Sequence, residues 1–422
     1  MASLNFDGCN TLYATHQLHP YAAKCPPQLV RYGLRYYSKP GETVLDPMAG
    51  SGTVLVEARL MDRGGVGFEI DPLALLIARA KCRPLHEQRI DTVYQMLAQH
   101  ARCDLDQLAS TKAESELRKR AVPPDFANRD YWFEPPVSQA LAVLLWHIEA
   151  TPMPREYRDF FRVAFSSLIL SKNSVANARD VIHSRHHHIV HAQPPDVMKR
   201  FEARVRAMRR QMEDFRQRCH DSPTLMVDAR LGDARQLPLD EESIDLIFTS
   251  PPYATALDYP RAHFLAIAWL QQALGVDLDQ YMTKASTYIG AERGRFGKGF
   301  RLDGRIEPFN LARSVVQSLA EHSTRQANLT QRYFADMSQV LSETARVLKP
   351  GRHAIIVVCP SHIRKVQVPT HEVLVEMGQA NALHFKQRHT RTIDERRRLL
   401  PYMQEAFGQR MSTEYVLIFQ KK

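Results

Sequence analysis

The chain has 422 residues, of which 44% are hydrophobic, and a formal net charge of +10. This length and apolar content support a sizeable core, in one large domain with insertions or in two smaller domains. No apolar run reaches the roughly 18 residues of a membrane span, and the first residues lack a signal-peptide pattern. The six cysteines are scattered without a CxxC pair, so neither a disulfide framework nor a zinc site is expected, and the cytoplasm is the expected compartment. The positive charge favours a polyanionic partner.

Residues 41–84 have the pattern of a strand, a helix, a second strand and a second helix, which opens a parallel α/β sheet. Gly50 and Gly52, in the turn after the first strand, permit positive φ angles and let a ligand lie against the backbone. The helix that follows presents free N–H groups at its N-terminus. Asp46, at the end of the strand, is placed to hold an ammonium or hydroxyl group. The whole turn reads Asp46-Pro47-Met48-Ala49-Gly50-Ser51-Gly52-Thr53.

The second strand ends in an acidic residue, Glu69, followed by Ile70. Glu69 lies 23 positions after Asp46, and an acidic side chain at this place in a doubly wound sheet holds a ribose diol. A glycine-rich turn alone is weak evidence for a cofactor site. Together with Glu69, it indicates a site formed at the ends of both strands.

Residues 85–222 are rich in helical periodicity and poor in strand signals. The clearest helix, 198–215, follows a pair of prolines and a candidate N-cap at Asp196, and its apolar residues are spaced by three and four. Its other faces carry many arginines and lysines. They form either a solvated face over a packed seam, which we favour, or a helix that tracks phosphates.

A histidine cluster lies in the same region, at positions 183, 186, 187, 188 and 191. His183, His187 and His191 would share one face of a helix, which could hold a metal ion. We nevertheless predict no metal site. We interpret the cluster as phosphate-facing or as part of a surface helix.

Strands resume at 225–227 and 244–248. The second of these runs into Ser250-Pro251-Pro252-Tyr253, which combines a hydroxyl, a turn stiffened by two prolines with free carbonyls, and an aromatic face. Those groups suit the amino group of a planar heterocycle. A Pro-Pro turn alone would mean little, but the glycine-rich turn upstream strengthens this interpretation.

The rest of the chain returns to an α/β pattern after an irregular segment, 271–330. Within it, 293–301 alternates glycines, cations and aromatics and reads either as a nucleic-acid clamp or as a flexible loop. A helix at 331–348, a strand at 354–359 and a hairpin of 384–392 with 415–420 follow. Arg396, Arg397 and Arg398 add a basic patch, whose neutralisation should weaken DNA binding and flatten its salt dependence.

Both turns resemble the motifs of S-adenosylmethionine-dependent amino-methyltransferases that modify bases in DNA. Asp-Pro-x-x-Gly-Ser-Gly-Thr is similar to their cofactor motif and Ser-Pro-Pro-Tyr to their catalytic motif in its N4-cytosine form. The likeness extends over about residues 12–80, 225–270 and 340–420, and includes 19–27 before the cofactor motif and 256–263 after the catalytic one. The cofactor motif precedes the catalytic motif here, whereas most N4-cytosine enzymes have the reverse order.

The resemblance implies a class I methyltransferase fold, a Rossmann-like doubly wound sheet that is mostly parallel, with an antiparallel strand near the C-terminus and a large helical insertion. The catalytic domain would comprise 1–84 and 223–422, interrupted by the insertion 85–222, a possible DNA-recognition region, and by the basic segment 271–330.

The implied reaction is direct in-line transfer of the methyl group from S-adenosylmethionine to N4 of a flipped-out cytosine. The implied catalytic residues are Ser250, Pro251, Pro252 and Tyr253, with Ser250 and the Pro251 carbonyl gripping the amine and Tyr253 stacking on the base. The implied cofactor residues are Tyr21, Lys24, Asp46, Pro47, Gly50, Ser51, Gly52, Thr53, Glu69, Ile70, Asp233 and Ala234; Asp233 would face the adenine and Lys24 the carboxylate of the cofactor.

Other functions stay open at this point. N6-adenine methylation of DNA uses the same conjugated-amine chemistry, and Ser250 only biases the choice toward cytosine. RNA guanine-N2 methyltransferases also place a cofactor motif before Pro-Pro-Tyr, but they generally have an acidic or amide residue at the position of Ser250. A catalytically silent nucleic-acid-binding module on the same fold is the third alternative. A restriction enzyme is a possible partner, and the sequence gives neither the target site nor the oligomeric state.

Overall fold

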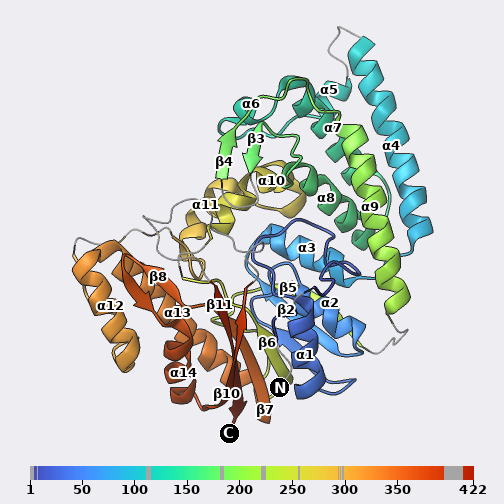
Figure 1. The fold of residues 1–422 in the computed structure, drawn as a ribbon. Coiled ribbons are helices and arrows are strands. Elements are labelled where there is room, and N and C mark those ends of the chain that lie inside the picture. Colours follow the sequence, from blue (N-terminus) through green and yellow to red (C-terminus); the bar gives the residue numbers. More distant parts are fainter. Residues whose placement is uncertain are drawn as a thin grey trace.

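The computed structural model describes residues 4–422 except 7, 111–115, 181–184, 220–224, 255–256, 293, 295, 297–298 and 394–411. The fold is built on a seven-stranded sheet in the order β10-β11-β7-β6-β1-β2-β5 (Figure 1). Five neighbouring strands run parallel, and β11 lies antiparallel between β7 and β10. This is the class I methyltransferase sheet that the sequence predicts. The strands are β1 (Thr43–Asp46), β2 (Gly64–Glu69), β5 (Val227–Leu231), β6 (Ile244–Thr249), β7 (Leu348–Val358), β10 (Leu383–Thr392) and β11 (Thr413–Lys421).

Helices cover both faces of the sheet because successive residues of its strands point to opposite sides. Val44 packs in the same cluster as helix α1 (Pro27–Tyr37), whereas its neighbour Leu45 packs in the cluster of α12 (Asn310–His322), α13 (Thr324–Val347) and α14 (Thr370–Ala380). The same alternation recurs in β6, β7 and β11. Helices α2 (Thr53–Leu60) and α3 (Pro72–Cys82) contact β2 and β5. A small hairpin, β8 (Ser361–Ile363) with β9 (Val366–Val368), follows β7.

Gly33 brings α1 against the middle of the sheet. A Cβ atom at this position would lie 2.6 Å from the ring of Phe248 and 3.0 Å from a methyl group of Ile355. We expect Gly33→Ala to lower the free energy of unfolding by about 1–3 kcal/mol, because α1 or the buried ring must move. Thermal denaturation measures this loss. Gly304→Ala is the control, since a Cβ there meets no atom within 4 Å; equal melting temperatures for the two variants would contradict the prediction.

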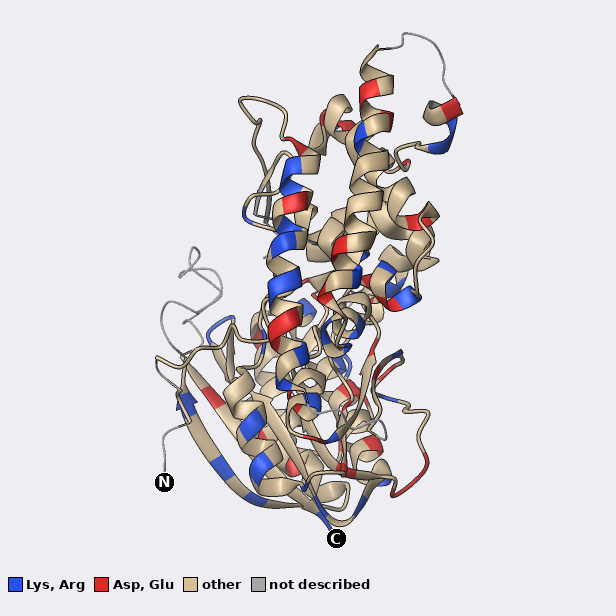
Figure 2. Cartoon of the chain, turned by 90° about the vertical axis from the view of Figure 1, so that its right-hand side faces the viewer, with Lys and Arg blue, Asp and Glu red and all other residues tan. Residues whose placement is uncertain are grey.

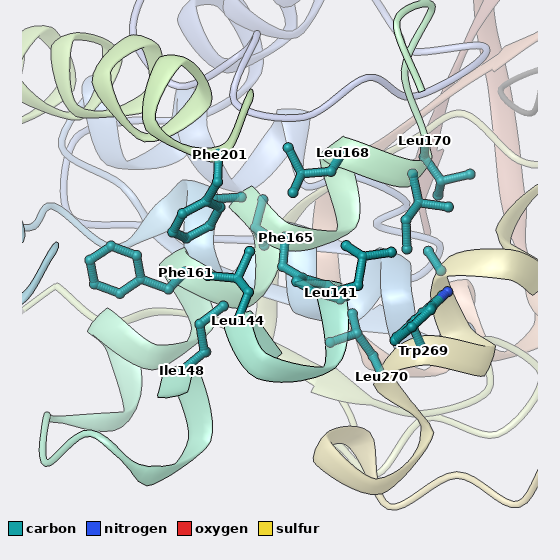
Figure 3. Close-up of a cluster of buried hydrophobic side chains, with 14 of the residues drawn as sticks. Leu141, Leu144, Ile148, Phe161, Phe165, Leu168, Leu170, Phe201, Trp269 and Leu270 are labelled. Atoms are coloured by element: carbon teal, nitrogen blue, oxygen red, sulfur yellow. The ribbon is translucent and has the colours of Figure 1, made fainter. Parts of the chain in front are cut away.

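The helical insertion is a separate layer beside the sheet. It contains α4 (Glu87–Ser110), α5 (Glu116–Arg120), α6 (Arg129–Trp132), α7 (Pro135–Ala150), α8 (Arg155–Ile169) and α9 (Val197–Arg218). Its apolar core brings α7, α8 and α9 together with Trp269 and Leu270 of α10 (Tyr259–Leu274), an element that follows the catalytic motif (Figure 3). The insertion therefore packs directly on α10, which follows the Ser250–Tyr253 turn.

Helix α9 confirms the helix predicted at 198–215. Asp196 caps it by accepting the N–H of Lys199, and the predicted apolar seam is buried throughout. Lysines and arginines recur along α9, interrupted by acidic residues (Figure 2). Many of these cations have partners within the protein: Arg216 pairs with Glu87, and Arg209 with Asp91. These ion pairs support the packed, solvated interpretation of the helix.

Two sequence-based expectations are wrong in this part of the chain. Residues 185–188 form strand β4 (Arg185–His188), which pairs with β3 (Ala178–Asp180), so His187 does not lie on a helix. His183 lies outside the described residues. The segment 271–330 is more helical than expected: it contains α11 (Leu278–Lys284), the short 3-10 helix η1 (Ala285–Thr287), α12 and the start of α13. The buried seam of α12, Ala312, Val315, Val316 and Leu319, has the helical spacing that would have revealed it.

No helix in the described ranges is long and apolar enough to cross a membrane. The basic patch at Arg396, Arg397 and Arg398 lies outside the described residues, and its role in DNA binding stays a prediction.

Candidate active site

A pocket opens at the carboxyl ends of the parallel strands, where doubly wound sheets bind their ligands. It encloses about 1100 Å³ including its open mouth. Most of the residues predicted for the site lie on its wall, and they come from both predicted motifs. These are Tyr21, Lys24, Asp46, Pro47, Gly50, Ser51, Thr53, Glu69, Ile70, Asp233, Ala234, Ser250 and Pro252. Three other predicted residues, Gly52, Pro251 and Tyr253, are not part of the wall.

The glycine-rich turn requires its glycines. Gly50 and Gly52 have φ angles of 49° and 80°, a region that side chains rarely adopt. Gly52 also begins α2, and a Cβ atom there would lie 3.0 Å from the Cα and Cβ atoms of Ala78 in α3. The turn can therefore approach α3 closely only without a side chain at this position.

Glu69 ties the end of β2 to this turn. Its Oε2 accepts the N–H of Gly50 at 2.7 Å, and its Oε1 accepts the N–H groups of Ile70 and Asp71, each at 2.8 Å. Burial raises the pKa of Glu69 to about 7, although the three N–H groups oppose this shift. These three hydrogen bonds thus fix the orientation of the Glu69 carboxylate on the pocket wall.

Asp46 also lines the pocket and is buried, with 4% of its surface exposed. Its Oδ1 accepts the hydroxyl of Thr249 at 2.8 Å and the N–H of Met48 at 3.2 Å. Burial raises the pKa of Asp46 to about 7. Thr249 directly precedes Ser250, so this hydrogen bond joins the cofactor turn to the start of the catalytic turn.

Three further predicted side chains, two charged and one aromatic, have partners within the protein. Asp233 pairs with Arg235 at 2.6 Å. The Nζ atom of Lys24 donates to the carbonyl of His16 at 2.8 Å, and burial lowers the pKa of Lys24 to about 8. Tyr21 stacks on Tyr259 with ring centroids 5.6 Å apart.

The catalytic turn leaves β6 in the position that the sequence predicts. The Ser250 hydroxyl donates to the carbonyl of Val357 in β7 at 3.3 Å. Since a hydroxyl has a single hydrogen, the Ser250 oxygen keeps its lone pairs available as acceptors. The Tyr253 hydroxyl points elsewhere and donates to Glu414 in β11 at 2.8 Å.

Sequence reasoning missed Asp71, Tyr259 and Tyr288, which also line the pocket. Asp71 caps α3 and accepts hydrogen bonds from His263 at 2.9 Å and from Tyr281 at 2.9 Å. It thereby ties the pocket to α10 and α11. The sequence Asp71-Pro72 before an apolar helix is a recognisable N-cap signal, but the contacts with α10 and α11 carry no such signal.

Comparison with known proteins agrees with this geometry. Residues 6–79, which include the glycine-rich turn and Glu69, match a family model described as DNA methylase. The type II methyltransferase M.MvaI of Kocuria varians is 23% identical over 406 residues, which cover 93% of this chain and 87% of that protein. M.MjaII of Methanocaldococcus jannaschii, another type II methyltransferase, is 37% identical over 78 residues, 18% of this chain and 15% of that protein.

By these matches the chain is similar to DNA amino-methyltransferases of the N4/N6 family. Among solved structures, a SAM-dependent methyltransferase of Methanosarcina mazei is similar over 92% of this chain and 96% of that one, at 10% identity. Its TM-score is 0.32.

S-adenosylmethionine is the cofactor of this methyltransferase, and the residues present fit it. The turn at Gly50 and Gly52 provides close backbone approach, and two carboxylates, Asp46 and Glu69, line the same pocket. Carboxylates suit the ammonium group and the ribose hydroxyls of this cofactor.

The two raised pKa values predict that cofactor binding depends on pH. Below pH 7, Asp46 and Glu69 become protonated in the free methyltransferase, and a protonated carboxyl is a weaker partner for an ammonium or hydroxyl group. We expect the Kd of S-adenosylmethionine to rise about 10-fold or more from pH 8 to pH 6, because one group of pKa 7 alone loses about that fraction of its ionised form. Calorimetry in two buffers of different ionisation enthalpy should also detect proton release on binding. A Kd that stays constant over this range would contradict the assignment.

Proposed function

We propose that this methyltransferase transfers the methyl group of S-adenosylmethionine to the exocyclic N4 amine of cytosine in DNA. The observation that supports it best is the position of Ser250 on the wall of the pocket that Asp46 and Glu69 also line. The likeness of Ser-Pro-Pro-Tyr to the N4-cytosine form of the catalytic motif favours cytosine over adenine.

The amine of cytosine is a poor nucleophile, because its lone pair is delocalised into the ring. Ser250 would accept one of its N–H groups, which is consistent with the donation of the Ser250 hydrogen to Val357. The carbonyl of Pro251 would accept the other. Two fixed acceptors favour a pyramidal nitrogen and direct its lone pair toward the methyl carbon, so positioning supplies most of the catalysis. When bound, the cofactor supplies the electrophilic methyl group on its sulfonium.

We further propose roles for the residues that would hold the cofactor. Asp46 would bind its ammonium group and Glu69 the ribose diol. Asp233 would lie against the adenine together with Ala234, and Tyr21 and Lys24 would close over the methionine end. Lys24 would face the carboxylate from its place beside the His16 carbonyl.

DNA is the substrate of this family, and a paired base cannot reach a pocket of this kind, so the target cytosine would be flipped out of the duplex. The insertion 85–222 and the segment 271–330 are the proposed DNA-contacting regions. Tyr288 and Ala291 of the second segment lie on the pocket wall, which supports a role near the target base. The relatives described as type II methyltransferases favour a partner restriction enzyme.

The identity of the modified base tests the proposal. Unmethylated DNA is incubated with the protein and isotope-labelled S-adenosylmethionine, digested to nucleosides and analysed by mass spectrometry. We expect the label in N4-methylcytosine. Label in N6-methyladenine would leave the site assignment unchanged but show that adenine is the modified base. Label in RNA alone would contradict the assignment of DNA as substrate.

A further inference from the structure

The catalytic turn is held by the C-terminal strand pair of the sheet, at a carboxylate that the reaction itself does not require. Glu414 in β11 lies directly opposite Arg391 in β10. Both side chains are largely buried, with 14% of Glu414 and 6% of Arg391 exposed, and they form an ion pair of 2.8 Å. A buried ion pair is weak evidence of stabilisation, because replacing it with packed apolar residues often leaves a protein equally or more stable.

The second oxygen of Glu414 points to a role other than stability. Its Oε1 accepts the hydroxyl of Tyr253 at 2.8 Å, while Oε2 faces Arg391. Burial raises the pKa of Tyr253 well above its ordinary value, so the phenol stays protonated and donates. The ring of Tyr253 is half-buried, so its hydroxyl is anchored while part of the side chain stays accessible.

The turn is therefore attached to the sheet at both of its ends. Ser250 is attached to Val357 of β7 and Tyr253 to Glu414 of β11, two strands that are neighbours in the sheet. Gly290 packs against the outside of the turn, since a Cβ atom there would lie 3.0 Å from the carbonyl oxygen of Tyr253. With these contacts, the direction of the Tyr253 ring depends on the partners of its hydroxyl at its far end, Glu414 and the Cys359 thiol.

We propose that Glu414 is a positioning residue that fixes the Tyr253 ring for stacking on the flipped-out base, and that Arg391 compensates the buried charge of Glu414. This inference rests on the proposed function, because it assigns to Tyr253 a contact with the target base. A planar aromatic ring contributes to stacking only in the orientation of the base, so a ring free to rotate would capture that base less often.

Two double variants separate the hydrogen bond from the ion pair. Both R391M/E414Q and R391M/E414L remove the buried charges, but only the glutamine keeps an oxygen that accepts the Tyr253 hydroxyl. Y253F removes the same hydrogen bond from the other side and leaves the ion pair intact. Each variant is assayed for kcat/KM toward DNA, for the Kd of S-adenosylmethionine and for melting temperature.

We expect R391M/E414Q to keep kcat/KM for DNA within about twofold, and R391M/E414L and Y253F each to lose about tenfold, with the Kd of the cofactor unchanged in all three. Adding Y253F to R391M/E414L should cause little further loss, because residues that act through one contact are not additive. Equal activity of the two double variants would overturn the proposal. If the double variants do not fold, Y253F alone tests the proposal, and a wild-type kcat/KM of this variant for DNA would overturn the proposal. A wild-type protein that methylates no DNA contradicts the proposed function instead.

Discussion

Replacement of Ser250 by alanine is expected to lower the rate of methyl transfer to DNA about 100- to 1000-fold, the usual effect of removing one preorganised polar contact with a reacting group. The hydroxyl would hold one N–H of the target amine, and the alanine variant offers no acceptor in its place. The Kd of S-adenosylmethionine should stay within about twofold, because Asp46 and Glu69 are untouched. Single-turnover kinetics with labelled cofactor measure the chemical step apart from product release.

Ser243 provides a matched control for this variant. It lies at the opposite end of β6, and its hydroxyl donates to the carbonyl of Asp240. Ser243→Ala should therefore leave the single-turnover rate unchanged. A Ser250→Ala variant that folds and transfers the methyl group at the wild-type rate would remove Ser250 from the catalytic site.

Replacement of Glu69 by alanine is expected to weaken cofactor binding about 100-fold or more. Two effects act together: the ribose diol loses a charged acceptor, worth about 1.5–3 kcal/mol per hydrogen bond, and the N–H groups of Gly50, Ile70 and Asp71 lose their shared partner. The turn that cradles the cofactor would then lose its fixed shape. Calorimetric titration with S-adenosylmethionine measures the effect.

Glu69→Gln should bind with intermediate affinity, because the amide keeps one oxygen acceptor but loses the charge. Glu42→Ala is the control: Glu42 accepts the N–H of Lys39 and pairs with Arg352 near the amino end of the sheet, away from the pocket. Cofactor affinity that is equal in Glu69→Ala and the wild type would show that the ribose lies elsewhere.

The sequence predicts the sheet and both turns well, because short-range signals carry them. Short apolar strands, Gly50 and Gly52 at positive φ, and Asp196 as an N-cap all depend on neighbours within a few residues. The hairpin of β3 and β4 was missed because a run of histidines has no strand periodicity. Helix α12 was missed although its apolar spacing was present, since the glycines and cations before it favoured an irregular segment.

The residues of the candidate site also differ in whether the sequence could predict their roles. Asp46 and Glu69 end strands and Ser250 directly follows one, so all three were predictable from the order of elements. Glu414 and Asp71 were not, because their roles depend on contacts across 161 and 192 residues of sequence, with Tyr253 and His263 respectively. The alignment of β11 with β7 decides which carboxylate reaches Tyr253, and no pattern in the sequence states that register.

The measurement that tests the central claim most directly uses a host cell without DNA methyltransferases of its own. The wild-type protein and Ser250→Ala are expressed there at equal levels, and N4-methylcytosine and N6-methyladenine in the purified genomic DNA are quantified by mass spectrometry. We predict N4-methylcytosine in cells with the wild type and its loss in cells with Ser250→Ala. Genomic DNA that contains neither modified base, from cells in which the folded wild-type protein binds S-adenosylmethionine, would contradict methyl transfer to DNA at this site.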